Sequence, residues 1–357
     1  MSSEFELKPP LGHESWLQGL WRAAAQDRLP HGLLLLGPAG IGKFTALRWF
    51  AAGLFCSEGP GTPCLACGPC RRLAAGTHAD LWVVDAVASG EDVLTIGFIA
   101  QREKAATTGY KGPAVADFLE LKAREGGWRI VLVREAERMN EAAQNAFLKT
   151  LEEPGQQTLI ALETAWPSRL LDTIRSRVVV VETQAPPRAD ALEVLLQAGI
   201  QGVDAVDLLR RSKGSPGAAL ASAREGGPAM LELLGQYFAG RPAAEVRRNL
   251  WELDGEFDGK TPAAQSRTRA SLFLDLGLAV LLDAERLAAG ARAEDLAFGD
   301  VAASIAPLGE QERRRRLAPW LEARQDVPIH LAPDGLVDRA LMGHAPLSPA
   351  PLSPAPR

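Results

Sequence analysis

Residues 32–45 read GLLLLGPAGIGKFT, an apolar run followed by a glycine-rich loop and then by a segment of helical character. The template of a phosphate-binding loop is G-x-x-x-x-G-K-[ST] between a strand and a helix, and Gly37, Gly42 and Lys43 match it. Glycines let backbone N–H groups close around a phosphate at a helix N-terminus, and the lysine adds a positive charge. This stretch predicts a P-loop. A plain glycine turn between strand and helix is the simpler alternative.

The position after the P-loop lysine lacks the hydroxyl that ligates Mg²⁺ in such loops. Phe44 stands there, and Thr45 follows about 100° further around the helix. A second ligand position is also changed, because Arg134 follows the apolar run where P-loop ATPases carry an aspartate. We therefore expect the chain to have lost ATP hydrolysis. Nucleotide binding stays open, at a degenerate site made of Gly37, Gly42, Lys43 and Thr45.

Four further apolar runs have the length of strands. They cover residues 81–85, 129–133, 158–164 and 178–181. Uninterrupted apolar runs are typical of strands buried on both faces, as in a parallel sheet. NEAAQNAFLKTLEEP predicts a helix that begins after Asn140 and ends before Pro154. The alternation of strands and helices up to residue 184 indicates a doubly wound α/β domain.

The chain beyond residue 184 carries no strand signal. Ala185-Pro186-Pro187 breaks the pattern, and residues 185–224 read as short helices around KGSPGAAL. Residues 225–341 are helical again and predict a larger helical domain. Residues 342–357 repeat PLSPA and carry almost nothing to bury, which indicates a disordered tail rich in proline.

All four cysteines lie within one short segment, at Cys56, Cys64, Cys67 and Cys70. Such clustering in a reducing compartment favours a metal site over disulfides. Four thiolates suit tetrahedral Zn²⁺, and an all-cysteine site is structural because it leaves no position open for water. An iron–sulfur cluster is the alternative, and His78 lies near enough in the sequence to replace one thiol. We expect a structural zinc module at residues 56–70.

Composition and charge exclude several classes of protein. The formal net charge is −5 and aromatic residues make up 6 %, which argues against a polybasic or aromatic-platform binder of nucleic acid. The apolar runs have the length of strands, too short for a transmembrane helix, and the first residues do not resemble a signal peptide. We therefore expect a cytoplasmic protein without membrane contact.

A further candidate is Arg177, which stands directly before the fifth apolar run in DTIRSRVVVVE. An arginine at the edge of a sheet can reach into a neighbouring subunit and stabilise phosphate charge there. A solvated surface arginine is the simpler interpretation of the spacing alone.

Together these motifs resemble the delta-prime subunits of the bacterial DNA polymerase III clamp loader, which are AAA+ proteins. The resemblance rests on GPAGIGKFT, on the cysteine module followed by AAGTHADLWVV, on GGWRIVLVREAERMNEAAQNAFLKTLEEP and on RLLDTIRSRV. It covers about residues 10–225. The C-terminal helices match the family only in length and helical character.

The resemblance implies an AAA+ α/β P-loop domain over residues 1–184, with a parallel sheet and a zinc-binding insertion. A small helical lid over 185–224 and an all-α collar over 225–341 would follow. The implied partners are gamma/tau and delta subunits in a hetero-pentamer, with the sliding clamp and primed DNA reached through the complex. The implied function is clamp loading during DNA replication, without ATPase activity of the isolated chain.

The resemblance also implies roles for two single positions. The family's Ser-Arg-Cys motif presents an arginine finger to ATP in a neighbouring subunit, and it reads Ser176-Arg177-Val178 here. Arg177 is therefore the candidate finger in trans, although the cysteine is absent. Gly217 stands where ATP-hydrolysing members carry a sensor arginine. An ATP-hydrolysing motor subunit of the gamma/tau type is the alternative, and an AAA+ adaptor outside replication is a second one.

Overall fold

The computed structural model describes residues 7–89, 91, 93–100, 114–125, 127–257, 261–327 and 332–342. The tail predicted for residues 342–357 lies outside the described residues, apart from Met342. The chain divides into two compact units. The first contains Met1–Gln197 and Gly214–Gly217, and the second contains Ala198–Lys213 and Ala218–Arg357. The domain boundaries predicted at residues 184 and 224 stay predictions.

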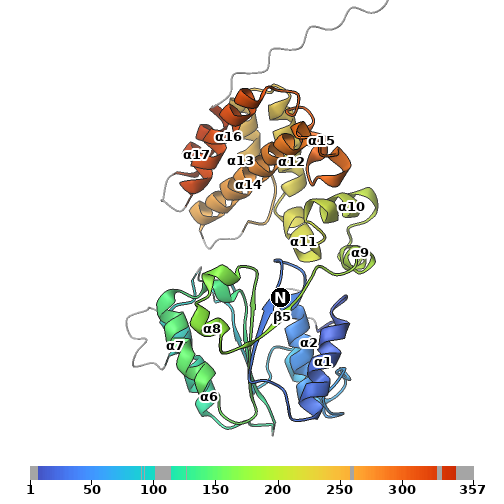
Figure 1. Cartoon of the computed structure of the whole chain (residues 1–357), viewed down its shortest axis with the longest axis vertical. Coiled ribbons are helices and arrows are strands. Elements are labelled where there is room, and N and C mark those ends of the chain that lie inside the picture. The colour runs from blue at the N-terminus through green and yellow to red at the C-terminus, as the bar shows by residue number, and fades with distance from the viewer. Residues whose placement is uncertain are drawn as a thin grey trace, which may run out of the picture. The chain divides into compact units, whose positions relative to one another are not determined.

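A five-stranded parallel sheet forms the centre of the first unit (Figure 1). Its strand order is β2-β3-β4-β1-β5, so the strand that leads into the glycine-rich loop lies inside the sheet. This confirms the parallel sheet predicted from the apolar runs. The strands are β1 (Gly32–Leu36), β2 (Leu81–Val84), β3 (Arg129–Val133), β4 (Thr158–Thr164) and β5 (Val179–Glu182).

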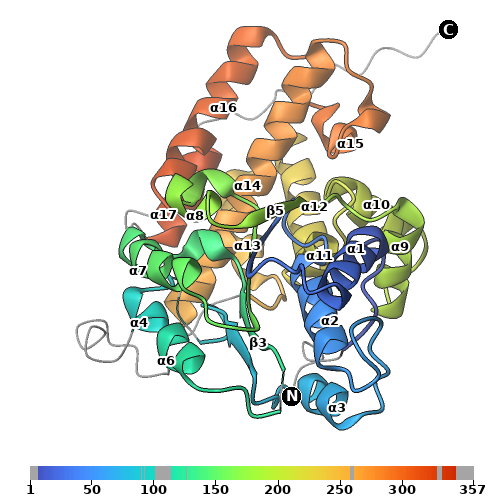
Figure 2. The same ribbon diagram turned by 60° about the horizontal axis from the view of Figure 1, so that its bottom comes forward.

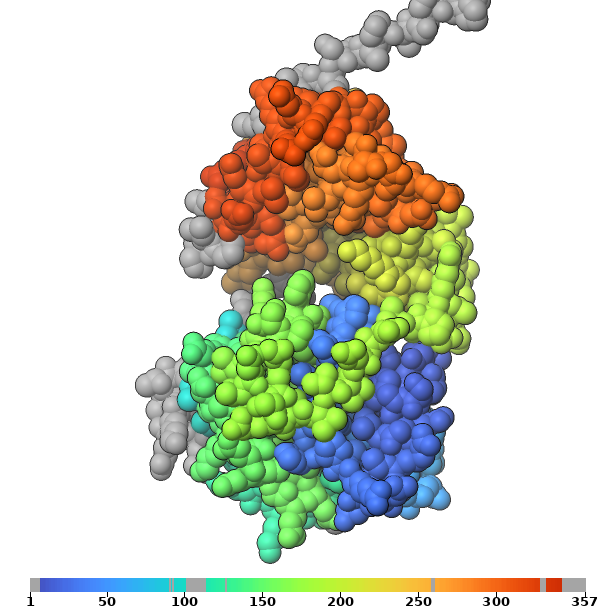
Figure 3. All heavy atoms as spheres, in the orientation of Figure 1, coloured from blue at the N-terminus to red at the C-terminus, as the bar shows by residue number. Residues whose placement is uncertain are grey.

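Helices cover both faces of this sheet (Figure 1). Alternate residues of each strand point to opposite faces, so each strand contributes side chains to both layers of packing. On one face, Leu33 and Leu35 pack with α1 (Glu14–Ala25) and α2 (Lys43–Phe55). The other face, which includes Leu34, is covered by α4 (Ile96–Ile99), α6 (Val115–Glu120), α7 (Glu141–Glu152) and α8 (Asp172–Arg175). In the space-filling view, blue N-terminal residues and green residues from the middle of the chain lie on opposite sides of this unit (Figure 3).

The helix α7 has the limits that the sequence predicts. Asn140 is its N-cap, and the side chain accepts a hydrogen bond of 2.9 Å from the backbone N–H of Ala143. Phe147 and Leu151 are buried against the sheet. The cap and the apolar stripe together fix where α7 begins and which side it buries.

The edge strand β5 differs from the prediction of strands buried on both faces. Val179 and Val180 are 51 % and 44 % exposed. Among the described residues, β5 pairs with β1 alone and is the last strand of the sheet. Four consecutive valines therefore mark an edge here, and the sequence pattern does not distinguish an edge from an interior strand.

The remaining helices are α3 (Gly68–Ala74) and α9 (Arg188–Gln197) in the first unit, and α10 (Gly202–Arg211), α12 (Gly227–Phe238), α13 (Ala243–Glu252), α14 (Pro262–Ala288), α15 (Gly299–Ala302), α16 (Glu310–Gln325) and α17 (Pro333–Met342) in the second. The helix α11 (Pro216–Arg224) begins with two residues of the first unit and continues in the second. Short 3₁₀ helices cover Ala136–Arg138, Pro167–Arg169 and Ala293–Asp295. No described helix is both long and apolar enough to cross a membrane.

The core of the second unit is built around Trp320 of α16, which is fully buried. Its indole ring packs among Tyr237, Phe238 and Phe273, with ring centroids 5.6–6.4 Å apart. The helices α14 and α16 lie side by side at this point (Figure 2). Gly277 of α14 makes room for the ring, because a Cβ there would lie 1.9 Å from Trp320 Cζ3.

Candidate functional site

The P-loop lysine lies at the start of α2 and is almost completely buried, with 3 % of its side chain exposed. Lys43 Nζ donates hydrogen bonds to the carbonyl oxygens of Gly37 at 3.0 Å and Pro38 at 2.8 Å. Glu163 Oε2, near the end of β4, lies 3.1 Å from the same nitrogen. An ammonium group has three N–H donors, so these three oxygens engage all of them.

The loop also contacts the segment 214–217 of the first unit. Ser215 Oγ donates a hydrogen bond of 2.8 Å to the carbonyl oxygen of Ala39. The backbone N–H of Gly217 donates another, also of 2.8 Å, to the carbonyl oxygen of Gly40. A Cβ at position 217 would lie 2.5 Å from Gly40 O, so this approach requires glycine. Gly217 therefore holds the loop through its backbone.

A buried histidine completes the set of contacts to the loop. His13 Nε2 lies 2.8 Å from the carbonyl oxygen of Ile41, while Nδ1 accepts a hydrogen bond of 3.2 Å from Trp16 Nε1. These partners assign the proton to Nε2 of a neutral ring. Burial lowers the pKa of His13 below its usual value, against a smaller opposing effect of the Ile41 carbonyl. Every carbonyl oxygen from residue 37 to residue 41 thus accepts a hydrogen bond.

The surroundings of Phe44 are unsuited to a divalent cation. The guanidinium carbon of Arg134 lies 5.5 Å from the centre of the Phe44 ring, and Arg134 Nη1 forms an ion pair of 3.0 Å with Asp85 Oδ2. A positive group and an aromatic ring thus occupy the two positions that supply oxygen ligands in P-loop ATPases. Thr45 is exposed, on a different side of α2 from Phe44. The residues present do not fit Mg²⁺.

The acid that would prepare a water molecule for attack is engaged elsewhere. Glu135 has a left-handed backbone, with φ of 48°, and its carboxylate pairs with Arg138. Its backbone N–H donates a 3.0 Å hydrogen bond to Glu163 Oε1. Lys43, Phe44, Arg134 and Glu135 therefore all depart from the arrangement that hydrolyses a nucleotide.

The four cysteines form a second candidate site. The Sγ atoms of Cys56, Cys64, Cys67 and Cys70 all lie within 4.8 Å of one another. A tetrahedral zinc site with Zn–S bonds of ~2.3 Å places its sulfur atoms ~3.8 Å apart, so the group is close to the required size. Backbone N–H groups point at two of the sulfurs, from Cys64 to Cys56 at 3.4 Å and from Cys67 to Cys64 at 3.3 Å. The set could therefore hold a metal ion through four thiolates.

The thiols of this group differ in acidity. A hydrogen bond from the backbone of Ser57 lowers the pKa of Cys67 to about 6. Burial raises the pKa of Cys70 to about 12. A metal held by all four sulfurs must therefore displace a proton from Cys70 at neutral pH, since thiolates are the ligands.

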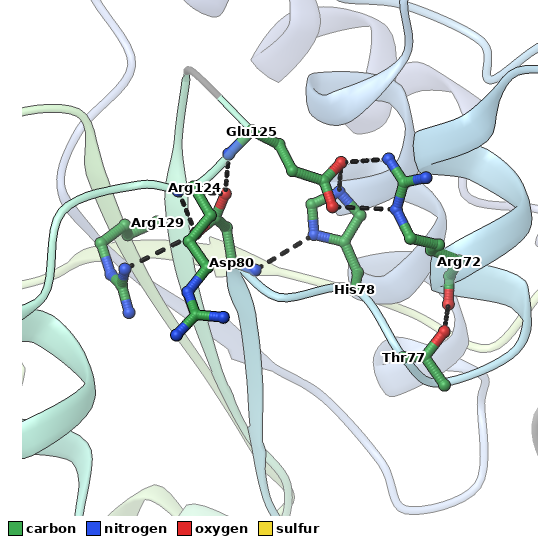
Figure 4. Close-up of polar contacts among 7 residues, drawn as sticks. All are labelled: Arg72, Thr77, His78, Asp80, Arg124, Glu125 and Arg129. Carbon is green, nitrogen blue, oxygen red and sulfur yellow. Dashed lines mark hydrogen bonds and ion pairs between the residues drawn. The ribbon is translucent and has the colours of Figure 1, made fainter.

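His78 lies outside the group of four thiols, although its sequence position would allow it to replace one of them. The ring is buried and stacks on Phe55 with centroids 3.9 Å apart. Its Nδ1 accepts a hydrogen bond of 3.3 Å from the backbone of Asp80, and Nε2 lies 3.4 Å from Glu125 Oε2 (Figure 4). Burial lowers its pKa, against a smaller opposing effect of the Glu125 carboxylate. The histidine anchors the segment that follows α3.

An ion pair joins the cysteine module to the sheet. Arg72 of α3 holds the carboxylate of Glu125 with both Nε, at 2.8 Å, and Nη2 (Figure 4). The carboxylate of Asp80, directly before β2, accepts hydrogen bonds of 2.9 Å from the backbone N–H groups of Arg124 and Glu125. These bonds fix the backbone that carries the Glu125 side chain. The Arg72 contact lowers the pKa of Glu125, so the pair stays ionised at neutral pH.

Arg177 lies just before β5 with 34 % of its side chain exposed. Its Nε and Nη2 donate to Glu152 Oε1 at 2.8 Å and 2.5 Å, and Nη1 donates to the Thr173 carbonyl oxygen at 2.9 Å. The guanidinium is thus held on the surface of the first unit by the last residue of α7. The pair is partly solvated, so it is a weak restraint.

Comparison with known proteins identifies the family. The family described as "DNA polymerase III, delta subunit" matches residues 12–187. The DNA polymerase III subunit delta' of Yersinia pestis is 30 % identical over 271 residues, which are 73 % of this chain and 75 % of that one. The chain belongs to the delta-prime family.

Other delta-prime proteins match a shorter region. The subunit delta' of Pseudomonas aeruginosa is 36 % identical over 211 residues, 56 % of this chain and 58 % of that one. The chain spans about half the length of several of the delta-prime relatives that it matches. Among solved structures, a Thermotoga maritima protein related to the DNA polymerase III gamma subunit has a TM-score of 0.40 at 19 % identity, covering 87 % of this chain and 99 % of that one.

The sequence predicts the P-loop glycines, Lys43 and the four cysteines as site residues, and the structure places each group as one cluster. It misses the partners that hold the loop, namely Glu163, Ser215 and His13. A signal existed for Glu163 alone, because it is the one charged residue within the apolar run TLIALET. In this delta-prime chain the other two come from segments far from the loop in sequence.

Proposed function

We propose that the chain acts as the delta-prime subunit of a bacterial clamp loader. In this role it assembles with gamma/tau and delta subunits as a hetero-pentamer and helps to load the sliding clamp on primed DNA. Membership of the delta-prime family carries the proposal. The P-loop domain over residues 1–184 and the lid over 185–224 would face the neighbouring ATP site, and the collar over 225–341 would join the subunits.

The proposed contribution to catalysis is Arg177, acting in trans. The surface position of this side chain before the edge strand β5 supports the role, since a finger must leave its own subunit to reach a neighbour's phosphates. Glu152 holds the guanidinium in the isolated chain. A nucleotide phosphate offers more negative charge than one solvated carboxylate, so the exchange of partners on assembly is favourable.

The test is ATP hydrolysis by the reconstituted complex. Replacing Arg177→Ala should slow the clamp- and DNA-stimulated rate severalfold and leave assembly intact, because an arginine finger is worth about 10³–10⁵ in rate at its own site. The matched control is Arg175→Ala, which removes a neighbouring guanidinium that pairs with Asp172. An unchanged rate in Arg177→Ala would rule out the finger.

The alternative is a motor subunit with its own ATPase activity, and the isolated chain distinguishes the two. The proposal expects no turnover without partners, because Arg134 and Phe44 stand where magnesium ligands are needed. Turnover by the isolated chain that disappears in Lys43→Ala would favour the motor subunit instead.

The four cysteines have a separate proposed role as ligands of one structural Zn²⁺. Their Sγ atoms lie within 4.8 Å of one another and the donor set is all thiolate, which supports zinc as the occupant. The ion would hold residues 56–70, which include the first turn of α3, in one conformation. It would take no part in a reaction, since four protein ligands complete its coordination.

A further inference from the structure

The environment of Lys43 raises a question that the changes at Phe44 and Arg134 leave open. The loop ends at Gly42, a left-handed N-cap with φ of 93°, and the lysine stands at the first position of α2. Two of the three ammonium protons are bonded to the loop's own carbonyl oxygens at Gly37 and Pro38. In a P-loop the remaining proton is available to a phosphate oxygen of the ligand.

In this chain that proton faces a carboxylate. Glu163 Oε2 lies 3.1 Å from Lys43 Nζ, and the exposed fractions of the two side chains are 8 % and 3 %. The position follows from the strand, because Leu159, Ala161 and Glu163 alternate onto the face that packs against α2. The backbone N–H of Glu135 holds the other oxygen, Oε1, at 3.0 Å. The carboxylate is therefore fixed at both oxygens before any ligand arrives.

We infer that the Glu163 carboxylate takes the place of a nucleotide phosphate at the P-loop lysine and thereby excludes nucleotides from the loop. A carboxylate and a phosphate both offer anionic oxygen to the ammonium, and the carboxylate is already tethered in position. An incoming phosphate must break a buried ion pair and then lie beside the displaced negative charge. This inference goes beyond the proposed function, because it concerns the isolated chain and needs no partner subunit.

The inference accounts for the survival of Lys43 in a loop that has lost its magnesium ligands. A buried lysine without a counter-charge would destabilise the fold, and so would a buried glutamate. Each residue therefore requires the other, whether or not a nucleotide is ever bound.

The experiment measures binding of ATP, ADP and inorganic pyrophosphate to the full-length chain by calorimetry, with EDTA present so that magnesium plays no part. Wild-type protein should show no binding at millimolar ligand. Glu163→Gln keeps an oxygen that can accept from Lys43 but removes the negative charge, and it should bind pyrophosphate and ADP at least tenfold more tightly. Glu163→Gln combined with Lys43→Met should lose that gain.

Two further variants make the result decisive. Glu182→Gln removes an equal charge from β5, beside β1, at an exposed residue, and it should leave binding unchanged. Glu163→Asp withdraws the carboxylate from the ammonium and serves as a second route if the glutamine variant folds poorly. A dissociation constant below 100 µM for the wild type would overturn the inference. Folded Glu163 variants that bind pyrophosphate and ADP no more tightly than the wild type would also overturn it. If neither Glu163 variant folds, the carboxylate supports the fold and does not substitute for phosphate, which also overturns it.

Discussion

Buried polar side chains hold the glycine-rich loop, and His13 is the one whose charge state is decided by its surroundings. The side chain is 2 % exposed, and both ring nitrogens are hydrogen-bonded to neutral partners, the Ile41 carbonyl oxygen and the Trp16 indole N–H. Its pKa is lowered chiefly by burial, and the Lys43 ammonium acts in the same direction. The folded chain therefore binds a proton at His13 less readily than the unfolded chain does.

This difference predicts how stability depends on pH. As the pH falls below about 6.5, the unfolded chain takes up a proton that the folded chain refuses, so the free energy of unfolding decreases by up to ~1.4 kcal/mol per pH unit. Above pH 7 the effect is absent. Replacing His13→Gln should reduce the dependence between pH 7 and pH 5 in denaturant unfolding, and the buried His78, whose pKa is also lowered, should account for part of the slope that remains. The exposed His31→Gln is the control, and equal slopes for His13→Gln and wild type would contradict the assignment.

At the residue scale, the sequence predicts side chains that belong to a motif and misses those that only complete it. Lys43 and the cysteines are found because their spacing is a property of one short segment. Ser215 and His13 reach the same loop from distant positions, and no periodicity in the sequence marks them. Such contacts follow from tertiary packing.

At the scale of elements, the cysteine module is the short helix α3 with the turn and bends that precede it, and it depends on external supports. The helix α3 has seven residues, fewer than a helix needs to be stable by itself. It is tied to the sheet by Arg72 and Glu125, and its own buried residues are Cys70 and Leu73. A metal ion would supply the remaining stability, by ~10 kcal/mol or more.

The metal content of purified protein tests this directly. Wild-type chain should contain about one zinc ion, Cys70→Ser should contain almost none, and both values can be measured by atomic emission. His78→Gln is the matched control, because His78 stacks on Phe55 outside the sulfur cluster. A loss of zinc in His78→Gln would make the histidine a ligand after all, and iron in place of zinc would favour the cluster alternative.

Element types are predicted well from the sequence where local signals agree. Asn140 and the stripe of Phe147 and Leu151 give α7 its start and its buried side. The strand β5 shows the limit, because VVVV indicates a buried strand and the chain places it at an edge. Strand order depends on which segments meet in space, and a single apolar run carries no information about its neighbours.

At the scale of the whole molecule, the two units have separate hydrophobic cores. The core around Trp320 draws all its buried members from the second unit, while the layers on both faces of the sheet belong to the first. A change inside one core should therefore leave the local contacts of the other intact.

Gly277 provides the corresponding test. Replacing Gly277→Ala inserts a methyl group 1.9 Å from a ring atom of Trp320, and overpacking of this kind costs ~1–3 kcal/mol or more. Thermal unfolding followed by tryptophan fluorescence should show the loss, and the zinc content should not change. Gly235→Ala in α12 is the control, since its Cβ would meet only Val301 Cγ1 at an ordinary 3.8 Å. Equal melting temperatures for the two variants would contradict the packing described.

The strand order of the first unit has a consequence for how the chain is made. The strand β1 pairs with β4 and β5, which follow it by more than 120 residues. At about 5–20 residues per second, the ribosome needs roughly 6–30 seconds to deliver those partners. During that interval the GLLLL segment has no sheet to join. Nascent chains halted before residue 158 should therefore be held by chaperones, and chains halted well beyond residue 182 should be released.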